Sequence, residues 1–345
     1  MSMKLRTSPH LVSDRSVERI MFHVVLALLP ICAFSVWQYG LSALALLVTV
    51  TASCLFTERW LNRAAGQAST LGDWSATITG LLLALTLPPA FPLWMGVVAA
   101  FVSIAIGKAM FGGLGHNLFN PALIGRAFVQ AAFPTAITIW VPAYASQRFT
   151  EFIPSTLTLP FMMPNDNVHW VAQASIDGFT GATPLARWKF EHFAYPIEDL
   201  LTGAVTASTG ETSAVLLAAC GLYLIARRFM DWRIPVAVLG SALLVALAFR
   251  MYDPVIYPPI HLVLFSGGLM LGALFMATDL ATSPVTPAGV WIYGALIGVV
   301  TVMIRYFGGL TEGVMYAILL GNALTPLIDQ YTQPRVFGTR QRRKS

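Results

Sequence analysis

The stretch IMFHVVLALLPICAFSVWQYGLSALALLVTVTASCLFT, residues 20–57, decides the class of fold. None of its 38 residues is Asp, Glu, Lys or Arg. A bilayer core needs about 20 mostly apolar residues per helix. The stretch therefore predicts two transmembrane helices, over 20–38 and 41–57.

The composition of the whole chain agrees with a membrane protein. Of its 345 residues, 56% are hydrophobic and only 11% are charged, whereas a soluble domain carries about 25% charged residues. The net charge of +5 is spread between and beyond the apolar runs, so we expect no nucleic-acid partner. Cys32, Cys54 and Cys220 lie inside apolar runs and form no Cys-x-x-Cys pair, so no metal site is predicted.

Apolar runs of spanning length predict an all-α, polytopic fold with about ten transmembrane helices. We expect them near 20–38, 41–57, 75–92, 94–112, 120–140, 211–227, 233–249, 260–277, 287–305 and 312–329. The third and eighth are predicted to be short or broken, because Pro88-Pro89 and Thr278-Asp279 cut into their ends.

The basic residues predict the orientation by the positive-inside rule. Fourteen of the 21 Lys and Arg collect on one side if both termini are cytoplasmic: Lys4, Arg6, Arg15, Arg19, Arg59, Arg63, Arg227, Arg228, Arg233, Arg335, Arg340, Arg342, Arg343 and Lys344. The predicted organisation is a cytoplasmic N-terminus (1–19), a first transmembrane repeat (20–140), a periplasmic loop (141–210), a second repeat (211–329) and a basic cytoplasmic tail (330–345). The expected location is the bacterial inner membrane, with lipid as a partner.

Short matches between the two halves predict an internal repeat. Phe111-Gly-Gly-Leu matches Phe307-Gly-Gly-Leu at an offset of 196 residues, and Gly80-Leu-Leu-Leu resembles Gly268-Leu-Met-Leu. Five predicted spans separate the copies, and because five is odd the two repeats would be inverted. Inverted repeats are typical of transport folds.

The segment Asp177-Gly-Phe-Thr-Gly-Ala-Thr-Pro-Leu-Ala186 carries the chemistry. Gly178 and Gly181 permit backbone conformations closed to other residues, and Pro184 is read as stopping a helix or strand through the site. The segment therefore predicts an exposed turn that presents the hydroxyls of Thr180 and Thr183, with Asp177 nearby. A threonine hydroxyl is a poor nucleophile unless it is activated, and a modifying enzyme could supply the activation.

Asp-x-x-Thr-Gly-Ala-Thr resembles the acceptor sequence of the flavin transferase that moves FMN from FAD onto threonine. The motif is found in the family formed by the D subunit of the Rnf (or Rsx) electron-transport complexes and the B subunit of the sodium-pumping NADH:quinone reductase. The resemblance extends from about Pro9 to Gln330. It includes the stretches Ser75–Ala84, Leu87–Pro89, Phe111–Ala122 and Ala277–Pro284.

The resemblance implies a function as well as a fold. It implies a covalent FMN phosphoester on Thr183, in a site formed by Asp177, Gly178, Thr180, Gly181 and Ala182. The flavin would relay electrons in a ferredoxin- and NAD-linked complex that translocates ions, with the A, B, C, E and G subunits of Rnf as partners and the transferase as a transient one. A second, non-covalent flavin such as riboflavin is compatible with the family.

Two alternatives remain open from the sequence. The chain could be the B subunit of a sodium-pumping NADH:quinone reductase, in which case quinone belongs to the pathway. It could instead be a flavin-free channel or transporter of the urea-transporter type, which would leave the long loop unexplained.

Polar residues within the apolar runs are candidates for function. Asp279, Asn120 and Asn322 are candidates for an ion path, although the two asparagines are equally compatible with hydrogen bonds to the exposed backbone around Pro121 and Pro326. Lys108, Arg126, Arg305, Glu312 and Asp329 lie near the ends of predicted spans, where snorkelling to the lipid headgroups is the expected explanation.

Overall fold

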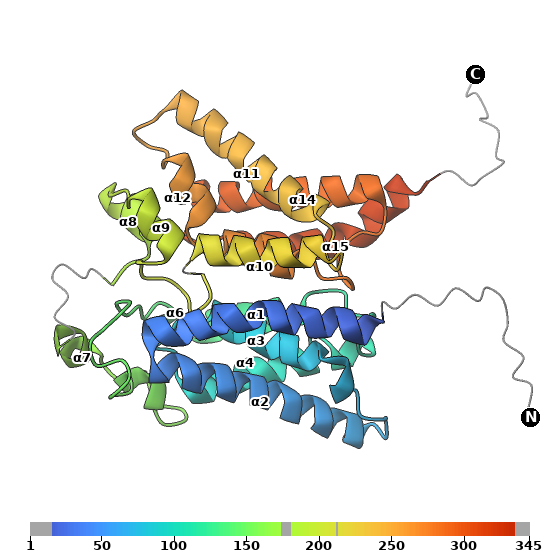
Figure 1. The fold of residues 1–345 in the computed structure, drawn as a ribbon, viewed down its shortest axis with the longest axis horizontal. Helices are drawn as coiled ribbons and strands as arrows, with labels where there is room; N and C mark the ends of the chain where they lie inside the picture. The colour runs from blue at the N-terminus through green and yellow to red at the C-terminus, as the bar shows by residue number, and fades with distance from the viewer. Residues whose placement is uncertain (1–15, 174–180, 212, 335–345) are drawn as a thin grey trace, which may run out of the picture.

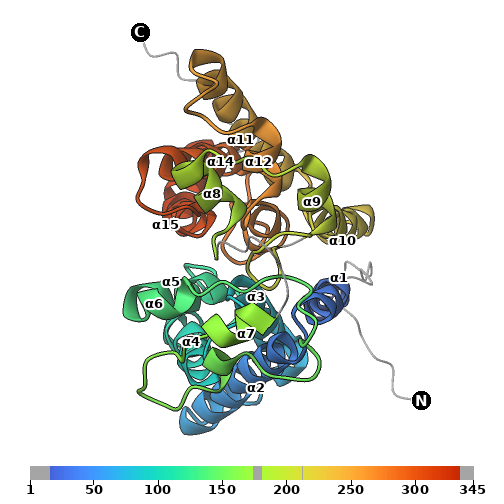
Figure 2. The same cartoon turned by 90° about the vertical axis from the view of Figure 1, so that its left-hand side faces the viewer.

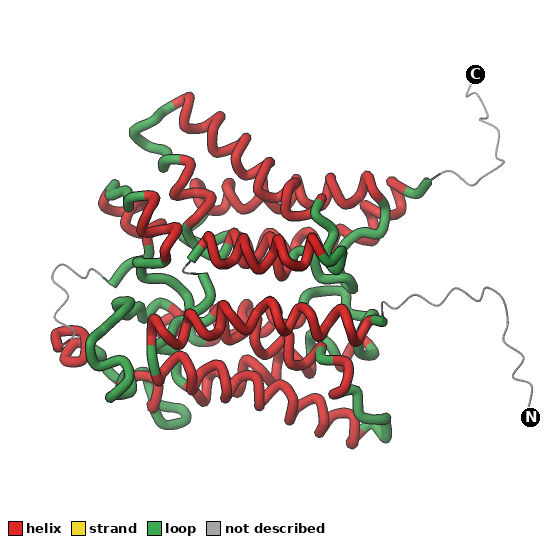
Figure 3. The backbone as a smooth tube through the Cα atoms, in the orientation of Figure 1, coloured by secondary structure: helices red, strands yellow, loops and turns green. Residues whose placement is uncertain are grey.

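The computed structural model describes residues 16–173, 181–211 and 213–334, and within these ranges the protein is built from helices, turns and loops without a β-strand. Figures 1 and 2 show two helical bundles side by side, one from each half of the chain. The first described turn of α1 and the last turn of α15 lie at the same end of the molecule (Figure 1), here termed the terminal end. Helices α7, α8 and α9 lie at the opposite end, the loop end. The tube in Figure 3 shows the same arrangement by secondary structure.

The first half contains five principal helices and several short ones. They are α1 (Val17–Tyr39), α2 (Leu41–Ala64), η1 (Leu71–Asp73), α3 (Ser75–Thr86), α4 (Leu93–Ala105), η2 (Ala109–Phe111), α5 (Pro121–Ala132) and α6 (Pro134–Ile137). Gly40 alone joins α1 to α2, and its φ of 72° is one that glycine adopts without strain.

The second half contains three longer helices and several short pieces. It contains α10 (Ala214–Ala226), α11 (Arg233–Tyr252), α12 (Ile260–Phe265), α13 (Leu269–Leu271), the π-helical turn η4 (Gly272–Met276), α14 (Pro287–Phe307) and α15 (Val314–Thr332). The connection between the halves contributes η3 (Pro154–Leu157), α7 (Val168–Gln173), α8 (Pro184–Glu191) and α9 (Ile197–Thr202).

Five helices among the described residues are long and apolar enough to cross a membrane. They are Val17–Tyr39, Leu41–Ala64, Leu93–Phe111, Arg233–Tyr252 and Pro287–Phe307, and Ser75–Thr86 and Ala214–Ala226 are shorter apolar helices. The protein is therefore a helical, multi-pass membrane protein. Cys32, Cys54 and Cys220 are buried and free, as the sequence predicted.

The expected interruption of the eighth span lies in its middle rather than at Thr278-Asp279. The helix stops at Phe265 and resumes at Leu269, with Gly267 at a φ of 65°. Arg305 donates hydrogen bonds to the carbonyls of Val263 at 2.6 Å and Ser266 at 3.2 Å. A break at membrane depth requires such partners for its freed backbone groups, so the arginine stabilises the break.

Close helix crossings within each half depend on glycine. A Cβ added to Gly125 on α5 would overlap with Oγ of Ser103 on α4, and one added to Gly298 on α14 would overlap with Oγ of Ser241 on α11. Small residues at such crossings let the helix backbones approach, which is how membrane helices gain packing contacts.

The connection between the halves divides into two parts that pack on different bundles. Trp170, Ile153 and Val141 belong to an apolar cluster with Tyr39 and Ala43 of the first half. A second cluster, formed by Leu185, Leu200, Val205 and Leu262, belongs to the second half. Each bundle therefore has its own cover at the loop end, as Figure 2 shows.

Candidate functional site

Thr183 is the N-cap residue of α8. Its hydroxyl oxygen accepts a hydrogen bond from the backbone N–H of Ala186 at 3.4 Å, and its carbonyl accepts one from the N–H of Arg187 at 2.9 Å. Pro184 occupies the first helical position, where its missing N–H has no consequence. The Thr-Pro pair thus begins a helix, which starts at Pro184 and does not extend back through Thr183.

The expected exposure of Thr183 was wrong, because only 4% of the residue is accessible. Gly181 and Ala182, which precede it, are partly exposed, and Gly181 adopts a φ of 66°. Asp177, Gly178 and Thr180 lie outside the described residues. The structure therefore places the predicted acceptor residue at the start of α8, in a buried position.

Several contacts hold α8 against the second half. Leu185 is 7% exposed within the cluster it forms with Leu200, Val205 and Leu262. Trp188 donates from its ring nitrogen to the Ile256 carbonyl at 3.4 Å, and Lys189 donates to the Gly308 carbonyl at 2.5 Å.

Arg187 of α8 contacts residues at and just beyond the end of the same helix. It donates to Glu191 at 3.0 Å and to the Tyr195 hydroxyl at 3.1 Å, and its guanidinium lies 4.3 Å from the ring centre of Phe193. The hydrogen bonds to Tyr195 and Glu191 raise the pKa of Arg187, so its positive charge is fixed.

A pocket at the loop end opens beside α8. It encloses about 710 Å³ of space, part of it open to solvent. Its wall is formed by Leu185, Trp188, Lys189, His192, Ile256, Tyr257, Pro258, Val263, Arg305, Tyr306 and Thr311. The pocket combines three aromatic rings with the cationic groups of Lys189 and Arg305.

A second pocket, of about 740 Å³ and partly open, is lined by residues of both halves, including the first turns of α1. Asn120 and Asp279 both line it, together with Asn117 and Lys108. The side-chain amide of Asn120 donates to the Met276 carbonyl at 3.2 Å, which links the halves. Asn322 is not among the residues that form this pocket, and its side-chain oxygen accepts from the Tyr293 hydroxyl at 2.8 Å. Two of the three ion-path candidates therefore lie together.

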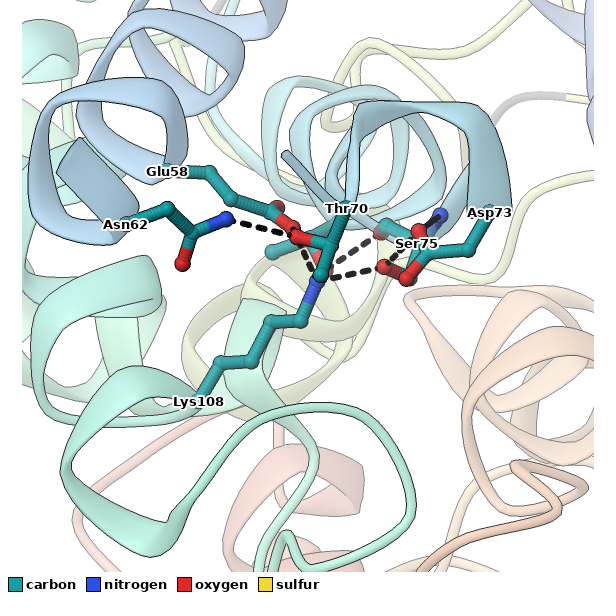
Figure 4. A network of polar contacts seen from close by, with 7 residues as sticks. Glu58, Asn62, Thr70, Asp73, Ser75 and Lys108 are labelled. Atoms are coloured by element: carbon teal, nitrogen blue, oxygen red, sulfur yellow. Dashed lines mark hydrogen bonds and ion pairs between the residues drawn. The ribbon is translucent and has the colours of Figure 1, made fainter. Parts of the chain in front are cut away.

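Lys108 does not snorkel to the headgroups but lies in a buried polar network (Figure 4). It is 4% exposed and donates to Glu58 at 2.7 Å and to Ser75 Oγ at 2.5 Å. Glu58 also accepts from Thr70, and Ser75 donates to Asp73 at 2.5 Å. The network joins the ends of α2, α3 and α4. Sequence reasoning missed Glu58, whose partner is 50 residues away.

Arg126 and Arg305 are likewise buried, at 6% and 5% exposed, so snorkelling was the wrong explanation for them too. Arg126 of the first half forms an ion pair of 2.9 Å with Glu312 of the second. Glu211 is 5% exposed and interacts electrostatically with Glu312, Arg126 and Arg305. The cluster crosses the contact between the halves. Asp329, by contrast, accepts from the backbone of Val285 and Thr286 at the start of α14.

The two bundles, the broken helix and the buried polar groups define a polytopic, all-helical membrane protein. Residues 4–338 match the model of the NQR2, RnfD, RnfE family, and the chain belongs to this family.

Curated relatives match the chain over nearly its whole length. The D subunit of the Na(+)-translocating ferredoxin:NAD(+) oxidoreductase complex of Acetobacterium woodii is 40% identical, over 100% of this chain and 98% of its own. The D subunit of the proton-translocating ferredoxin:NAD(+) oxidoreductase complex of Clostridium ljungdahlii is 38% identical, over 98% and 96%. The D subunit of the ion-translocating oxidoreductase complex of Halorhodospira halophila is 37% identical, over 97% and 95%.

Proposed function

We propose that this protein is the D subunit of an Rnf-type complex that couples electron transfer between ferredoxin and NAD to ion translocation, and that Thr183 carries FMN as a covalent phosphoester. The observation that carries the proposal is the position of Thr183, the last residue of the acceptor-like motif, at the N-terminus of α8. The full-length match to relatives named as the D subunit favours this assignment over the B subunit of a quinone reductase.

The residues around Thr183 fit a flavin phosphate. The N-terminus of a helix presents free N–H groups and the positive end of the helix dipole, which favour a phosphate. The pocket beside α8 offers Trp188, Tyr257 and Tyr306 for stacking against a flat ring. FMN bound there would supply one- and two-electron redox chemistry.

The chain's own groups would adjust that chemistry. The aromatic wall limits water around a bound ring, and Lys189 and Arg305 place positive charge beside it. Positive charge in a poorly solvated site makes reduction of a bound ring more favourable. Lys189 is fixed by its hydrogen bond to the Gly308 carbonyl, so its charge is held in place.

The proposed topology has ten spans in two inverted repeats, with both termini cytoplasmic and Thr183 on the periplasmic side of the inner membrane. Helices α1 and α10, the first of each half, start at opposite ends of the molecule (Figure 1). Lys108 follows α4 and contacts Ser75, whereas Arg305 ends α14 and contacts Val263. The separation of Ser75 from Val263 equals that of Gly80 from Gly268, which supports the repeat.

The pocket near the terminal end is the proposed site for a second, non-covalent flavin such as riboflavin. It is mostly apolar with a few convergent polar groups, as small-molecule sites are. The side-chain oxygen of Asn117 is buried without a hydrogen-bond partner and belongs to the pocket wall, as do Asn120 and Asp279. These groups could bond the polar edge of a flavin.

The proposed partners are the A, B, C, E and G subunits of Rnf, the flavin transferase and membrane lipid. Two relatives of similar identity are named for different ions, sodium and the proton. Overall similarity therefore does not set the coupling ion, and Asp279 with Asn120 remains the proposed ion path, with Asn322 the more distant candidate.

The decisive experiment is to produce the protein in a host with the flavin transferase and examine a denaturing gel for flavin fluorescence. Thr183→Ala should abolish the fluorescence. Thr202→Ala, at an exposed threonine of α9, is the matched control and should leave it unchanged. Mass spectrometry of the peptide containing Thr183 locates the added FMN. A dark wild-type band with active transferase would make the flavin-free transporter the better assignment.

A further inference from the structure

The acceptor hydroxyl proposed above is inaccessible in the folded protein. Thr183 is 4% exposed, and its hydroxyl oxygen is already engaged with the Ala186 N–H. Attachment of FMN requires the transferase to bring the FMN phosphorus of FAD to about 3–3.5 Å from that oxygen, in line with the leaving group. The transferase cannot bring FAD that close while Thr183 is buried at the start of α8.

Helix α8 is the element whose movement would free the hydroxyl. It is eight residues long, and isolated helices shorter than about 12–15 residues are marginal in water. Of its side chains, only Pro184 and Leu185 are buried, while Phe190 is 75% exposed. Few buried contacts mark a unit that opens locally at low cost.

We infer that Thr183 is modified only while α8 is undocked from the second half, and that modification is followed by redocking of the helix. This inference rests on the proposed FMN attachment at Thr183. In the undocked state the threonine oxygen attacks the FMN phosphorus of FAD. A new P–O bond forms, the pyrophosphate bond breaks, AMP leaves, and the hydroxyl proton passes to a base of the transferase.

The N-cap position of Thr183 favours redocking of α8 after modification. The threonine oxygen accepts a hydrogen bond from the first turn of α8 in the unmodified chain. A phosphodiester brings further acceptor oxygens and one negative charge to the same helix N-terminus, where both are stabilising. The contacts of Leu185, Trp188 and Lys189 are then available to re-form. The inference also sets an order of assembly, in which a partner that covers α8 binds after FMN is attached.

The test is the rate of FMN attachment to purified, full-length, unmodified protein mixed with the transferase and FAD. Leu185→Ala removes the buried anchor and should raise the initial rate at least ~10-fold, because a truncated buried leucine destabilises the docked state. Lys189→Met removes the hydrogen bond to Gly308 and should raise it about threefold. Phe190→Ala truncates an exposed residue of the same helix and should leave the rate unchanged.

The outcomes separate this inference from the proposed function. Equal rates for wild type, Leu185→Ala and Lys189→Met would refute the undocking step while leaving the attachment site intact. An equal increase for Phe190→Ala would also refute it, since the effect would not come from docking. If no variant and no wild-type protein acquired FMN from an active transferase, the proposed attachment itself would fall. Lys189→Met decides the question if Leu185→Ala does not give a monodisperse protein.

Discussion

Replacing Lys108 by Met should destabilise the protein severely, because this lysine is buried rather than on the surface. Lys108 and Glu58 form an ion pair of 2.7 Å whose side chains are 5% and 4% exposed. Without the lysine, the buried Glu58 carboxyl would lose its cationic partner and keep only Thr70 among the contacts of the described structure.

The size of the effect follows from the burial of both partners. Removing one member of a buried ion pair costs about 3–5 kcal/mol, because the other charge is left uncompensated. For a chain of this length a change of 1 kcal/mol moves the unfolding temperature by roughly 2 °C. We therefore expect Lys108→Met to lower the unfolding temperature by roughly 6–10 °C.

The assay is thermal unfolding of detergent-purified protein, followed by the monodisperse fraction that survives heating. Arg63→Met, at an exposed cation near the end of α2, is the control and should change the unfolding temperature little. The double variant Glu58→Gln/Lys108→Met should recover most of the loss, because no net charge is then buried. A Lys108→Met loss equal to that of Arg63→Met, or a double variant as unstable as the single one, would refute the electrostatic reasoning.

Three further predictions concern other parts of the molecule. Arg126→Gln breaks the ion pair with Glu312 between the halves and should lower the free energy of unfolding by about 3 kcal/mol. The same heating assay measures it, and a stability equal to that of the wild type would contradict the prediction. Thr183→Ser keeps a hydroxyl cap and should remain fluorescent on a denaturing gel. Thr183→Val should be dark and should weaken the N-cap of α8 by about 1 kcal/mol. A fluorescent Thr183→Val variant would contradict the assignment of the flavin to Thr183. Gly298→Val places a branched side chain against Ser241 and the α11 backbone and should abolish monodisperse elution, while Gly309→Val, where nothing lies within 4 Å, should not.

The long helices of the two bundles could be predicted because each depends on a local apolar run. The two weakest runs behave differently from the others in the structure as well: α3 ends at Thr86, just before Pro88-Pro89, and the run 260–277 is divided into three pieces. The position of the second break could not be predicted. It depends on Arg305, which is 39 or more residues away in sequence and bonds the freed carbonyls.

The buried ions were missed for the same reason. Hydropathy treats each charge alone, so Lys108 and Arg126 looked like residues that need the headgroups. Their actual partners, Glu58 and Glu312, lie 50 and 186 residues away. Within the predicted flavin site, one local signal was available and was misread. Threonine followed by proline is a helix-start pattern. In the structure Thr183 is therefore the buried N-cap residue of α8 rather than part of an open turn.

The division of the long connection has a consequence for how the chain can be cut. The part up to Gln173 packs on the first half and α8 and α9 pack on the second. Residues 203–210, which follow α9, hydrogen-bond back to the first half. A gene split between Gln173 and Gly181 would encode two pieces, one with the cover of the first half and one with α8. Contacts such as the Gln38 amide with the Gly203 carbonyl and the Tyr39 hydroxyl with Ala207 would then act between two polypeptides. Expressed as two chains, the protein would depend on these contacts for its assembly.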